Sequence, residues 1–284
     1  NCAYPKTALT LIQEIAWDIN RSDMPIINLS GQDLSGLNFE HINLSYSNFR
    51  GSNFTSANIA NADFTSANLS GADLSAKDLT ENILTGTDLR NANLIGADIS
   101  NNELVNTILT GADLTYANLS GSDLSTANIF GIVDGFNVLE KTKLIGANLT
   151  NANLTNTNLI GVNISEIILK GADLTGVKLE KAKANNANLE GVDLSFKNLS
   201  KIRLVDANLS KTIFSGADLS NAKLMGANLS DADLTGAKLI DANLTNANLT
   251  GANFHMADLT GAHLEGVIIN ETTLSCIGHE ICTS

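Results

Sequence analysis

The residues best suited to chemistry lie near the end of the chain, where Cys276, His279 and Cys282 fall within seven positions. Thiolate and imidazole groups are common zinc ligands, and two cysteines can also form a disulfide. A structural zinc site needs a fourth ligand, and none stands at a familiar zinc spacing from these three residues. We therefore predict no metal site, and we keep Cys276 and Cys282 as a candidate disulfide.

Other groups that could support catalysis are scattered. The four histidines are His41, His255, His263 and His279, and no Ser or Cys nucleophile has a suitably spaced partner. No glycine-rich phosphate loop precedes a helix. Carboxylates recur with a regular period, so a pair at catalytic separation is expected from geometry alone. The sequence therefore predicts no enzyme, no catalytic residues and no cofactor.

The elements that position these residues follow a five-residue period. From Leu29 to Leu274, all 50 positions spaced by five are apolar except Asp134, and Ala184 is undersized. The residue two before each of these centres is usually small, the one just before is mostly Asn or Asp, and Ser or Thr follows. An α-helix would spread such centres around its whole circumference, whereas short extended stretches joined by corners would stack them into one column. We therefore expect an all-β solenoid.

The repeat resembles the A(D/N)LXX consensus of the pentapeptide repeat family. The runs that carry the resemblance are ANLSGADLS, GADLTYANLSGSDLS and DANLTNANLTGANFHMADLTGAHLE, and the match extends from residue 27 to residue 274. The resemblance implies a right-handed, four-sided β-helix with four pentapeptides in each 20-residue coil. Its 50 units correspond to about 12 coils. We assign residues 26–274 to this β-helix.

Both ends of a solenoid need caps, because an open coil exposes its core and its backbone edge. Apolar residues recur at helical spacing near the start (Leu9, Ile12, Ala16 and Ile19), so we predict a capping helix over residues 1–25, with a partner-binding helix as the alternative. Residues 275–284 leave the repeat and form the predicted carboxyl-terminal cap. A disulfide there would suit the periplasm or the thylakoid lumen, as in cyanobacterial or chloroplast-lumen proteins that the chain resembles. A reducing cytoplasm with free thiols is the alternative.

Charge is distributed unevenly around and along the predicted coils. The chain has a formal net charge of −13, which disfavours direct binding to nucleic acid, and no apolar run is long enough to insert into a membrane. Counting in twenties places Asp33, Asp73, Asp113, Asp173, Asp193 and Asp233 on one side. The opposite side carries a basic stripe, which consists of Lys141, Lys143, Lys181, Lys183, Lys201, Arg203 and Lys223. Residues 1–140 hold 16 acidic and 5 basic residues, so the first half is the acidic one.

One segment departs from the consensus at a core position. Asp134 occupies a centre of the repeat, and Phe136 stands close by in the sequence FGIVDGFNVLE. A bulge in which Phe136 or Val133 replaces Asp134 in the core is one interpretation, and an apolar docking patch is the other.

These features favour a non-catalytic scaffold that presents a rigid charged surface to an unknown protein partner. The basic stripe and the segment with Asp134 and Phe136 are the candidate contacts. The alternative is an acidic mimic of duplex DNA that binds a type II topoisomerase such as gyrase, as some members of the family do. Against that alternative, no insertion interrupts the five-residue period to supply projecting loops. A third interpretation is that the stacked charges only keep the solenoid soluble. The oligomeric state stays open.

Overall fold

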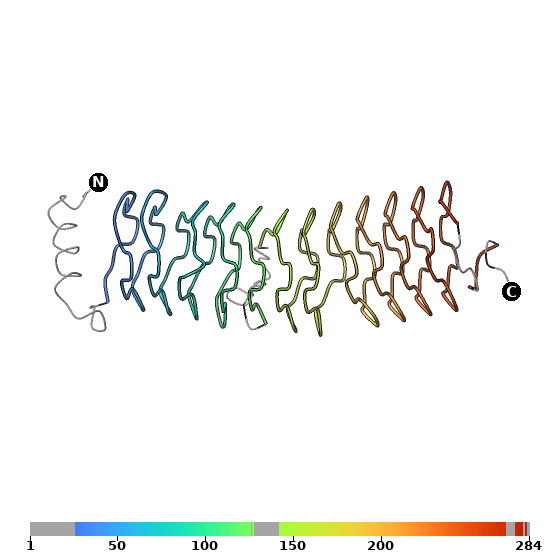
Figure 1. Cartoon of the computed structure of the whole chain (residues 1–284), viewed down its shortest axis with the longest axis horizontal. Helices are drawn as coiled ribbons and strands as arrows, with labels where there is room; N and C mark the ends of the chain where they lie inside the picture. The colour runs from blue at the N-terminus through green and yellow to red at the C-terminus, as the bar shows by residue number, and fades with distance from the viewer. Residues whose placement is uncertain (1–25, 126, 128–141, 271–275, 281, 283–284) are drawn as a thin grey trace, which may run out of the picture. The chain divides into compact units, whose positions relative to one another are not determined.

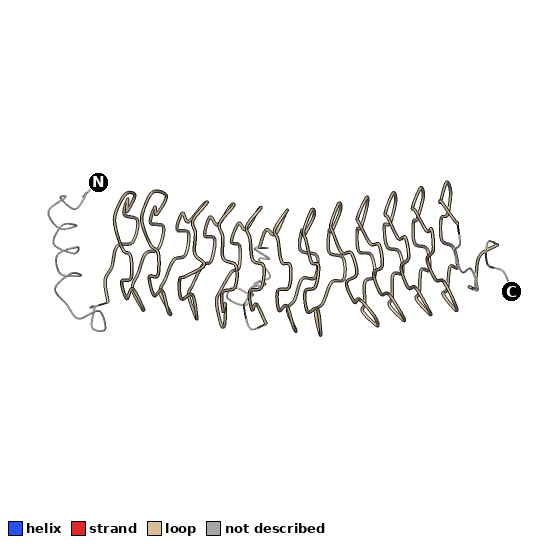
Figure 2. Ribbon diagram, viewed as in Figure 1, coloured by secondary structure: helices blue, strands red, loops and turns tan. Residues whose placement is uncertain are grey.

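The computed structural model describes residues 26–125, 127, 142–270, 276–280 and 282 (Figure 1). Within these ranges there is no helix and no strand longer than a single paired residue, so the ribbon is drawn as loop throughout (Figure 2). The predicted capping helix lies outside the described residues. So do three residues of the predicted contact surface, Asp134, Phe136 and Lys141.

Parallel pairing at a fixed interval builds the coils. Each isolated bridge except the last joins a residue to the residue twenty positions later, as from Asn28 to Asn48 and from Asn48 to Asn68. Around the first of these bridges, the Leu29 N–H donates to the Asn48 carbonyl at 2.8 Å, and the Asn48 N–H donates to the Ile27 carbonyl at 2.8 Å. Four five-residue sides therefore make one coil, and adjacent coils pair as parallel strands do.

Corners join the sides, and they explain the polar part of the consensus. At the first corner the Gln32 N–H donates to the Leu29 carbonyl at 3.2 Å, and Gly31 has a φ of 68°. The equivalent corner residues in the described ranges share this left-handed conformation, except Ser56 and Glu81. Most of these corner residues are not glycine. The Asn or Asp before each corner stabilises it, as where the Ser70 N–H donates to Asn68 Oδ1 at 3.0 Å.

The interior of each coil is filled by large centres and small inward residues. The centres are almost fully buried, and near the start four phenylalanines (Phe39, Phe49, Phe54 and Phe64) pack with ring centroids 5.4–6.5 Å apart. The inward residue two before each centre is usually a buried Ala. Where it is Ser or Thr, its hydroxyl commonly bonds the previous coil, as when Thr212 Oγ1 donates to the Leu189 carbonyl at 2.8 Å. Burial of these hydroxyls is compensated by hydrogen bonds.

A stack of asparagines runs along one side of the later coils. Asn188, Asn208, Asn228 and Asn248 pair in succession, and the stack is bounded by Ile168 before it and Ile268 after it. Each later amide donates from Nδ2 to the Oδ1 of the preceding one, at 3.2, 3.4 and 3.2 Å. The side-chain amides therefore repeat the pairing of the backbone.

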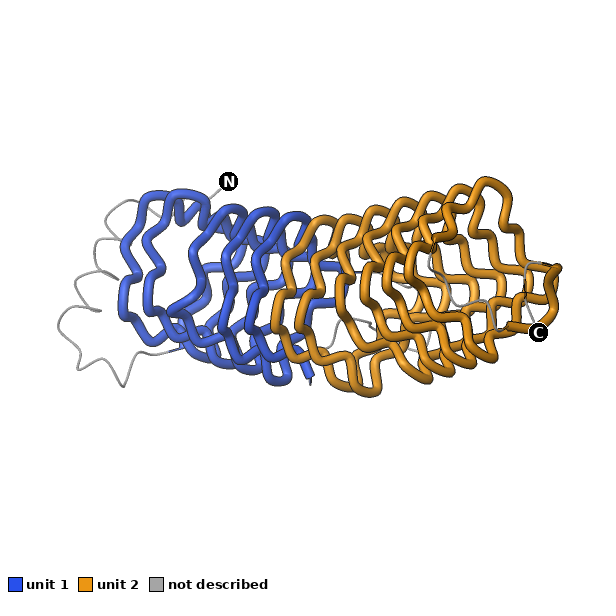
Figure 3. The backbone as a smooth tube through the Cα atoms, turned by 45° about the vertical axis from the view of Figure 1, so that its right-hand side comes forward, with its two compact units in different colours: residues 1–142 blue, residues 143–284 orange. Residues whose placement is uncertain are grey.

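The chain divides into two compact units, residues 1–142 and residues 143–284 (Figure 3). Inside the first unit the register shifts. Thr107 Oγ1 donates to the Leu84 carbonyl, 23 residues earlier, whereas Thr142 Oγ1 donates to the Leu109 carbonyl at 2.7 Å, 33 residues earlier. Ten residues beyond a regular coil therefore separate Leu109 from Thr142.

This register shift bears on one expectation from the sequence. The five-residue period is unbroken, as predicted, but it does not exclude an insertion, because ten residues equal two repeat units and leave the five-residue count intact. Faces assigned by counting in twenties consequently hold only within one unit. Bridges place Asp33, Asp73 and Asp113 on one side of the first unit, and Asp193 and Asp233 on one side of the second unit.

Truncating one buried centre will test the stacked core. We expect Leu209→Ala to lower the free energy of unfolding by about 2–5 kcal/mol, because the side chain is fully buried and the parallel pairing on both sides prevents collapse of the cavity. Urea unfolding followed by circular dichroism measures the change. Lys238→Ala, on an exposed side of the same unit, is the matched control and should stay within about 0.5 kcal/mol of the parent. Equal effects from both variants would contradict the described core.

Candidate functional site

The described part of the basic stripe lies in the second unit. Parallel bridges join Lys183 to Arg203 and Arg203 to Lys223, which places three exposed cations on successive coils at a spacing of about 4.8 Å. Lys181 and Lys201 occupy the preceding corner in two of these coils, with left-handed φ values of 59° and 60°. We name Lys181, Lys183, Lys201, Arg203 and Lys223 the cationic row. Lys143 begins this unit and is also exposed, while Lys141 lies outside the described residues.

The backbone beneath the cationic row is fully paired. Arg203 donates its N–H to the Ala182 carbonyl at 3.0 Å, and its own carbonyl accepts from the Ala184 N–H at 2.7 Å. The small Ala184 centre is fully buried below it. The two ion pairs in the described part of the chain are His41 with Glu40 and Arg90 with Asp88, so neither involves the row. The row is therefore a group of positive charges that face solvent from a paired backbone.

The described part of the first unit has the opposite charge. Residues 26–125 contain eleven acidic and three basic residues. Two of the three cations are engaged, since Arg90 pairs with Asp88 and Lys77 donates to the Ala57 carbonyl at 2.6 Å. The aspartates on these coils precede corners and accept the N–H two residues later, as Asp63 Oδ1 does from Thr65 at 2.8 Å. This surface is strongly negative, and the backbone fixes its carboxylates in place.

Hydrogen bonds at the corners also change carboxylate acidity. The pKa of Asp258 lies below its ordinary value, chiefly because the Thr260 hydroxyl and then the Thr260 N–H donate to it, at 2.6 and 3.0 Å. The pKa values of Asp173 and Asp193 are lowered in the same way by the hydroxyls and N–H groups of Thr175 and Ser195, with a smaller contribution from the charge of Lys197. A hydrogen bond donated to a carboxylate stabilises its charged form and so favours ionisation.

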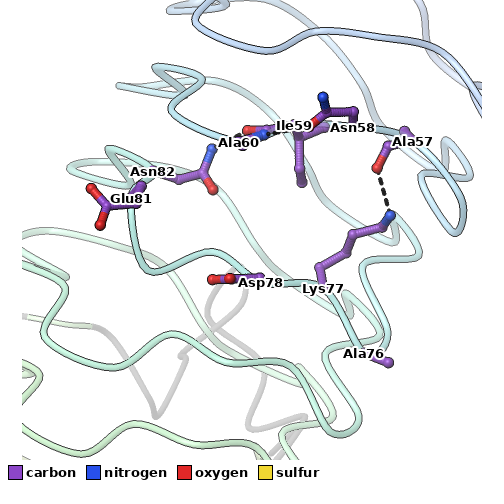
Figure 4. Close-up of a pocket in the computed structure, with 9 residues that line it drawn as sticks. All are labelled: Ala57, Asn58, Ile59, Ala60, Ala76, Lys77, Asp78, Glu81 and Asn82. Carbon is purple, nitrogen blue, oxygen red and sulfur yellow. Dashed lines mark hydrogen bonds between the residues drawn. The ribbon is translucent and has the colours of Figure 1, made fainter.

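Two polar residues that the sequence analysis did not single out line a pocket in the first unit (Figure 4). Lys77 occupies an inward position that is usually Ala, and burial lowers the pKa of its ammonium group. Asn82 occupies the next inward position and donates from Nδ2 to the carbonyls of Ile59 and Ala62, at 2.6 and 3.0 Å. The pocket beside them has a volume of about 230 Å³. The sequence could have revealed Lys77, because a Lys is exceptional among the residues two before each centre.

At the carboxyl end, a disulfide joins Cys276 to Cys282, whose Cα atoms are 5.0 Å apart. Cys276 is buried at an inward position, and Ile277 continues the pairing by bridging Asp258 at an interval of 19 residues instead of 20. His263, Glu265, His279 and Glu280 line a pocket of about 510 Å³ nearby. No group of three or more His, Cys, Asp or Glu side chains within the described ranges is placed to hold a metal ion. The same ranges contain no helix long and apolar enough to cross a bilayer.

A stack of four-sided coils built from five-residue units defines the class of protein as a β-solenoid. The chain belongs to the pentapeptide repeat family, whose model, Pentapeptide repeats, matches in eight copies over residues 27–129 and 138–266. The predicted family is thus confirmed, and it implies a right-handed β-helix. Proteins of this family are generally non-catalytic repeat proteins.

Several solved pentapeptide repeat proteins are similar to the chain. HetL, involved in heterocyst differentiation regulation in the cyanobacterium Nostoc sp. strain PCC 7120, is 25% identical over 95% of this chain and 97% of its own, with a TM-score of 0.26. Rfr23 from the cyanobacterium Cyanothece 51142 is 35% identical over 43% of this chain and 90% of its own, with a TM-score of 0.29. QnrB1, a plasmid-mediated fluoroquinolone resistance protein, is 23% identical over 70% and 89%, with a TM-score of 0.31. No curated protein sequence matches the chain.

Thiol counting will test the bond between Cys276 and Cys282. The chain contains three cysteines, so the unfolded, unreduced protein should show one reactive thiol, at Cys2, and three after reduction. Cys282→Ser should raise the unreduced count to two. Closing a loop of this size stabilises by about 2 kcal/mol, so the variant should also unfold at a lower temperature. Three thiols in protein purified without reductant would contradict the bond.

Acid titration will test the corner carboxylates. A carboxyl group whose pKa is lower in the folded state contributes stability above its unfolded pKa of about 3.9, and this contribution is lost as the pH falls through the folded value. We expect the free energy of unfolding to change little from pH 7 to about pH 5 and to fall below about pH 4. Replacing Asp173, Asp193 and Asp258 by Asn preserves an acceptor at each corner and removes the titration. An equally steep acid limb in that triple variant would show that these groups are not its source.

Proposed function

We propose that the chain is a non-catalytic scaffold that presents a rigid charged surface to a protein partner. The cationic row is the observation that carries this proposal, because Lys183, Arg203 and Lys223 project from successive coils on a paired backbone. Side chains held on a regular sheet lose little backbone entropy when they bind. An acidic protein surface is the partner chemistry that fits five closely spaced cations.

The filled interior supports recognition over catalysis. Large centres and small inward residues occupy the coils, so the chemistry left to this chain lies in the side chains that face solvent. Exposed charges at the rim of an interface act mainly on the rate of association and on its salt dependence. The predicted contacts Lys141, Asp134 and Phe136 remain part of the proposed surface as predictions from the sequence.

Charge reversal on the cationic row tests the scaffold proposal. Immobilised parent protein and a Lys183→Glu, Arg203→Glu, Lys223→Glu variant would be exposed to extract of the source cell, and bound proteins quantified by mass spectrometry. We expect at least one acidic protein to be retained by the parent and reduced about tenfold or more on the variant, with retention weakening as salt rises. The control for net charge is a triple variant with three reversals on other sides of the same unit, Lys170→Glu, Lys178→Glu, Lys238→Glu. Identical retention by all three proteins would sink the proposal.

Phe136 offers a separate test of the apolar contact. If the segment around Asp134 docks a partner, Phe136→Ser should weaken retention of that partner at an unchanged melting temperature. A lowered melting temperature with unchanged retention would instead assign Phe136 to packing. Circular dichroism and the capture experiment above distinguish the two results.

A second candidate function follows from the acidic first unit. Eleven carboxylates against three basic residues over residues 26–125 can stand in for phosphates, so this unit could occupy the basic DNA channel of a type II topoisomerase. A gyrase supercoiling assay tests it with the parent and with a variant in which Asp63, Asp73, Asp78, Asp88 and Asp98 become Asn. The consensus accepts Asn at these positions, as where Asn68 caps its corner with the geometry that Asp63 uses. No inhibition by micromolar parent protein would exclude this function for gyrase.

The disulfide bears on the choice between the two functions. A bond between Cys276 and Cys282 persists in an oxidising compartment, which supports the periplasm or the thylakoid lumen, while gyrase works in a reducing one. The scaffold proposal is compatible with either. The thiol count in protein isolated from its own cell therefore distinguishes the cytoplasm from the two oxidising compartments.

A further inference from the structure

Two lysines occupy inward positions that the repeat otherwise fills with uncharged side chains. The inward column runs in steps of five from Ile27 to Thr272, and Lys77 and Lys197 are its only charged members. Both are partly buried. A long side chain with a charged end cannot fit where Ala usually lies between a corner and a core centre. The coils beside it must therefore change their pairing.

The pairing of coils is interrupted beside Lys77. Regular register would pair Asn58 with Asp78, and this bridge is missing although its neighbours on both sides along the column are present. The N–H groups of Ile59 and Asp78, which should bond across the two coils, donate to no carbonyl. Lys77 Nζ instead donates to the Ala57 carbonyl, which the Asp78 N–H would otherwise bond. The pocket of Figure 4 lies in this opening.

A second, independent interruption accompanies Lys197 in the other unit. Lys178 and Asn198 form no bridge, although each is paired on its other side. The N–H groups of Leu179 and Asn198 donate to no carbonyl, and the opening extends to the adjacent missing pair of Asp173 and Asp193. Lys197 occupies the inward position next to Asn198, and its charge contributes to lowering the pKa of both of those aspartates.

Bulk at an inward position does not by itself open the coils. Ile202 is bulky but apolar, and the bridge beside it between Lys183 and Arg203 is intact. Short hydroxyl side chains such as Thr212 bond the previous coil without interrupting it. Asn102 coincides with a missing bridge between Ile83 and Glu103 and with a pocket of about 250 Å³, whereas the bridge beside Asn82, between Asp63 and Ile83, is present. An inward Asn therefore opens the coils at one position and not at another, unlike the two inward lysines.

We propose that Lys77 and Lys197 are wedges, each of which holds two coils apart on one side and so gives each unit a joint. At the first joint the other sides of the same two coils remain paired, as between Asn48 and Asn68 and between Asn53 and Asp73. The coils can therefore separate locally there while the stack as a whole stays folded. A scaffold with such a joint can adjust the spacing of its surface side chains to a partner. The device does not depend on which partner is bound.

Amide hydrogen exchange of the full chain tests the wedge at Lys77. We expect the amides of Ile59, Asn61 and Asp78 to exchange rapidly in the parent, since none of them donates a hydrogen bond. In Lys77→Ala, which restores the common inward residue, the coils should close and these amides should exchange about tenfold or more slowly. The melting temperature should also rise. Lys197→Ala should protect Leu179 and Asn198 in the same manner without affecting the first joint.

Two further variants keep the test decisive. Lys77→Met retains the length of the inward side chain without its charge, and Lys223→Ala removes an outward lysine beside an intact bridge. Closure in Lys77→Met would overturn the role assigned to the polar end, and protection of Ile59 in Lys223→Ala would show a general charge effect. Unchanged exchange in Lys77→Ala, at a melting temperature no lower than that of the parent, would overturn the wedge. A lower melting temperature in Lys77→Ala would do the same, because it would make the lysine a stabilising contact.

Discussion

The hydrogen bonds between successive coils are the constraint on which the rest of the structure depends. Each side contributes only about three extended residues, too few for an isolated strand, so pairing at the 20-residue interval is what fixes the backbone. The consensus serves this pairing. Small inward residues bring the backbones close, large centres fill the column, and Asn or Asp holds each corner. A long, charged inward side chain such as Lys77 therefore acts directly on the pairing between coils.

The five-residue period predicted the coil because one residue type recurs at each structural position. Leu209, Ala207 and Asn208 can be assigned to centre, inward and paired positions from the sequence alone, and the structure places them there. The ten extra residues before Thr142 could not be found in this way, because an excess of two whole units preserves the period. The interruptions at Lys77 and Lys197 were also missed. Their signal lay in the inward column, where a single substitution does not disturb the count of centres.

For the charged surfaces too, the sequence predicted one part of the arrangement and not another. Counting in twenties correctly grouped Lys183, Arg203 and Lys223, since all three lie within one unit. It also grouped Asp33, Asp73 and Asp113 within the first unit, and Asp193 and Asp233 within the second. A sequence with a perfect period therefore determines neighbours on adjacent coils but not the alignment of distant faces. Surface function in such a solenoid has to be derived unit by unit.

The asparagine stack gives the second unit an electrical direction. Each amide from Asn208 to Asn248 donates toward the start of the chain, so the four side-chain dipoles point the same way and polarise one another. Asn188 has no asparagine before it to receive its Nδ2 hydrogens, since Ile168 precedes it, and Asn248 faces Ile268 in the same way at the other end. A row of identical residues thus has chemically different ends: the first ends in an amide donor, and the last ends in an oxygen that accepts from the Thr250 N–H and hydroxyl. A neutral part of the surface thereby has a polarity along the coils that formal charge does not reveal.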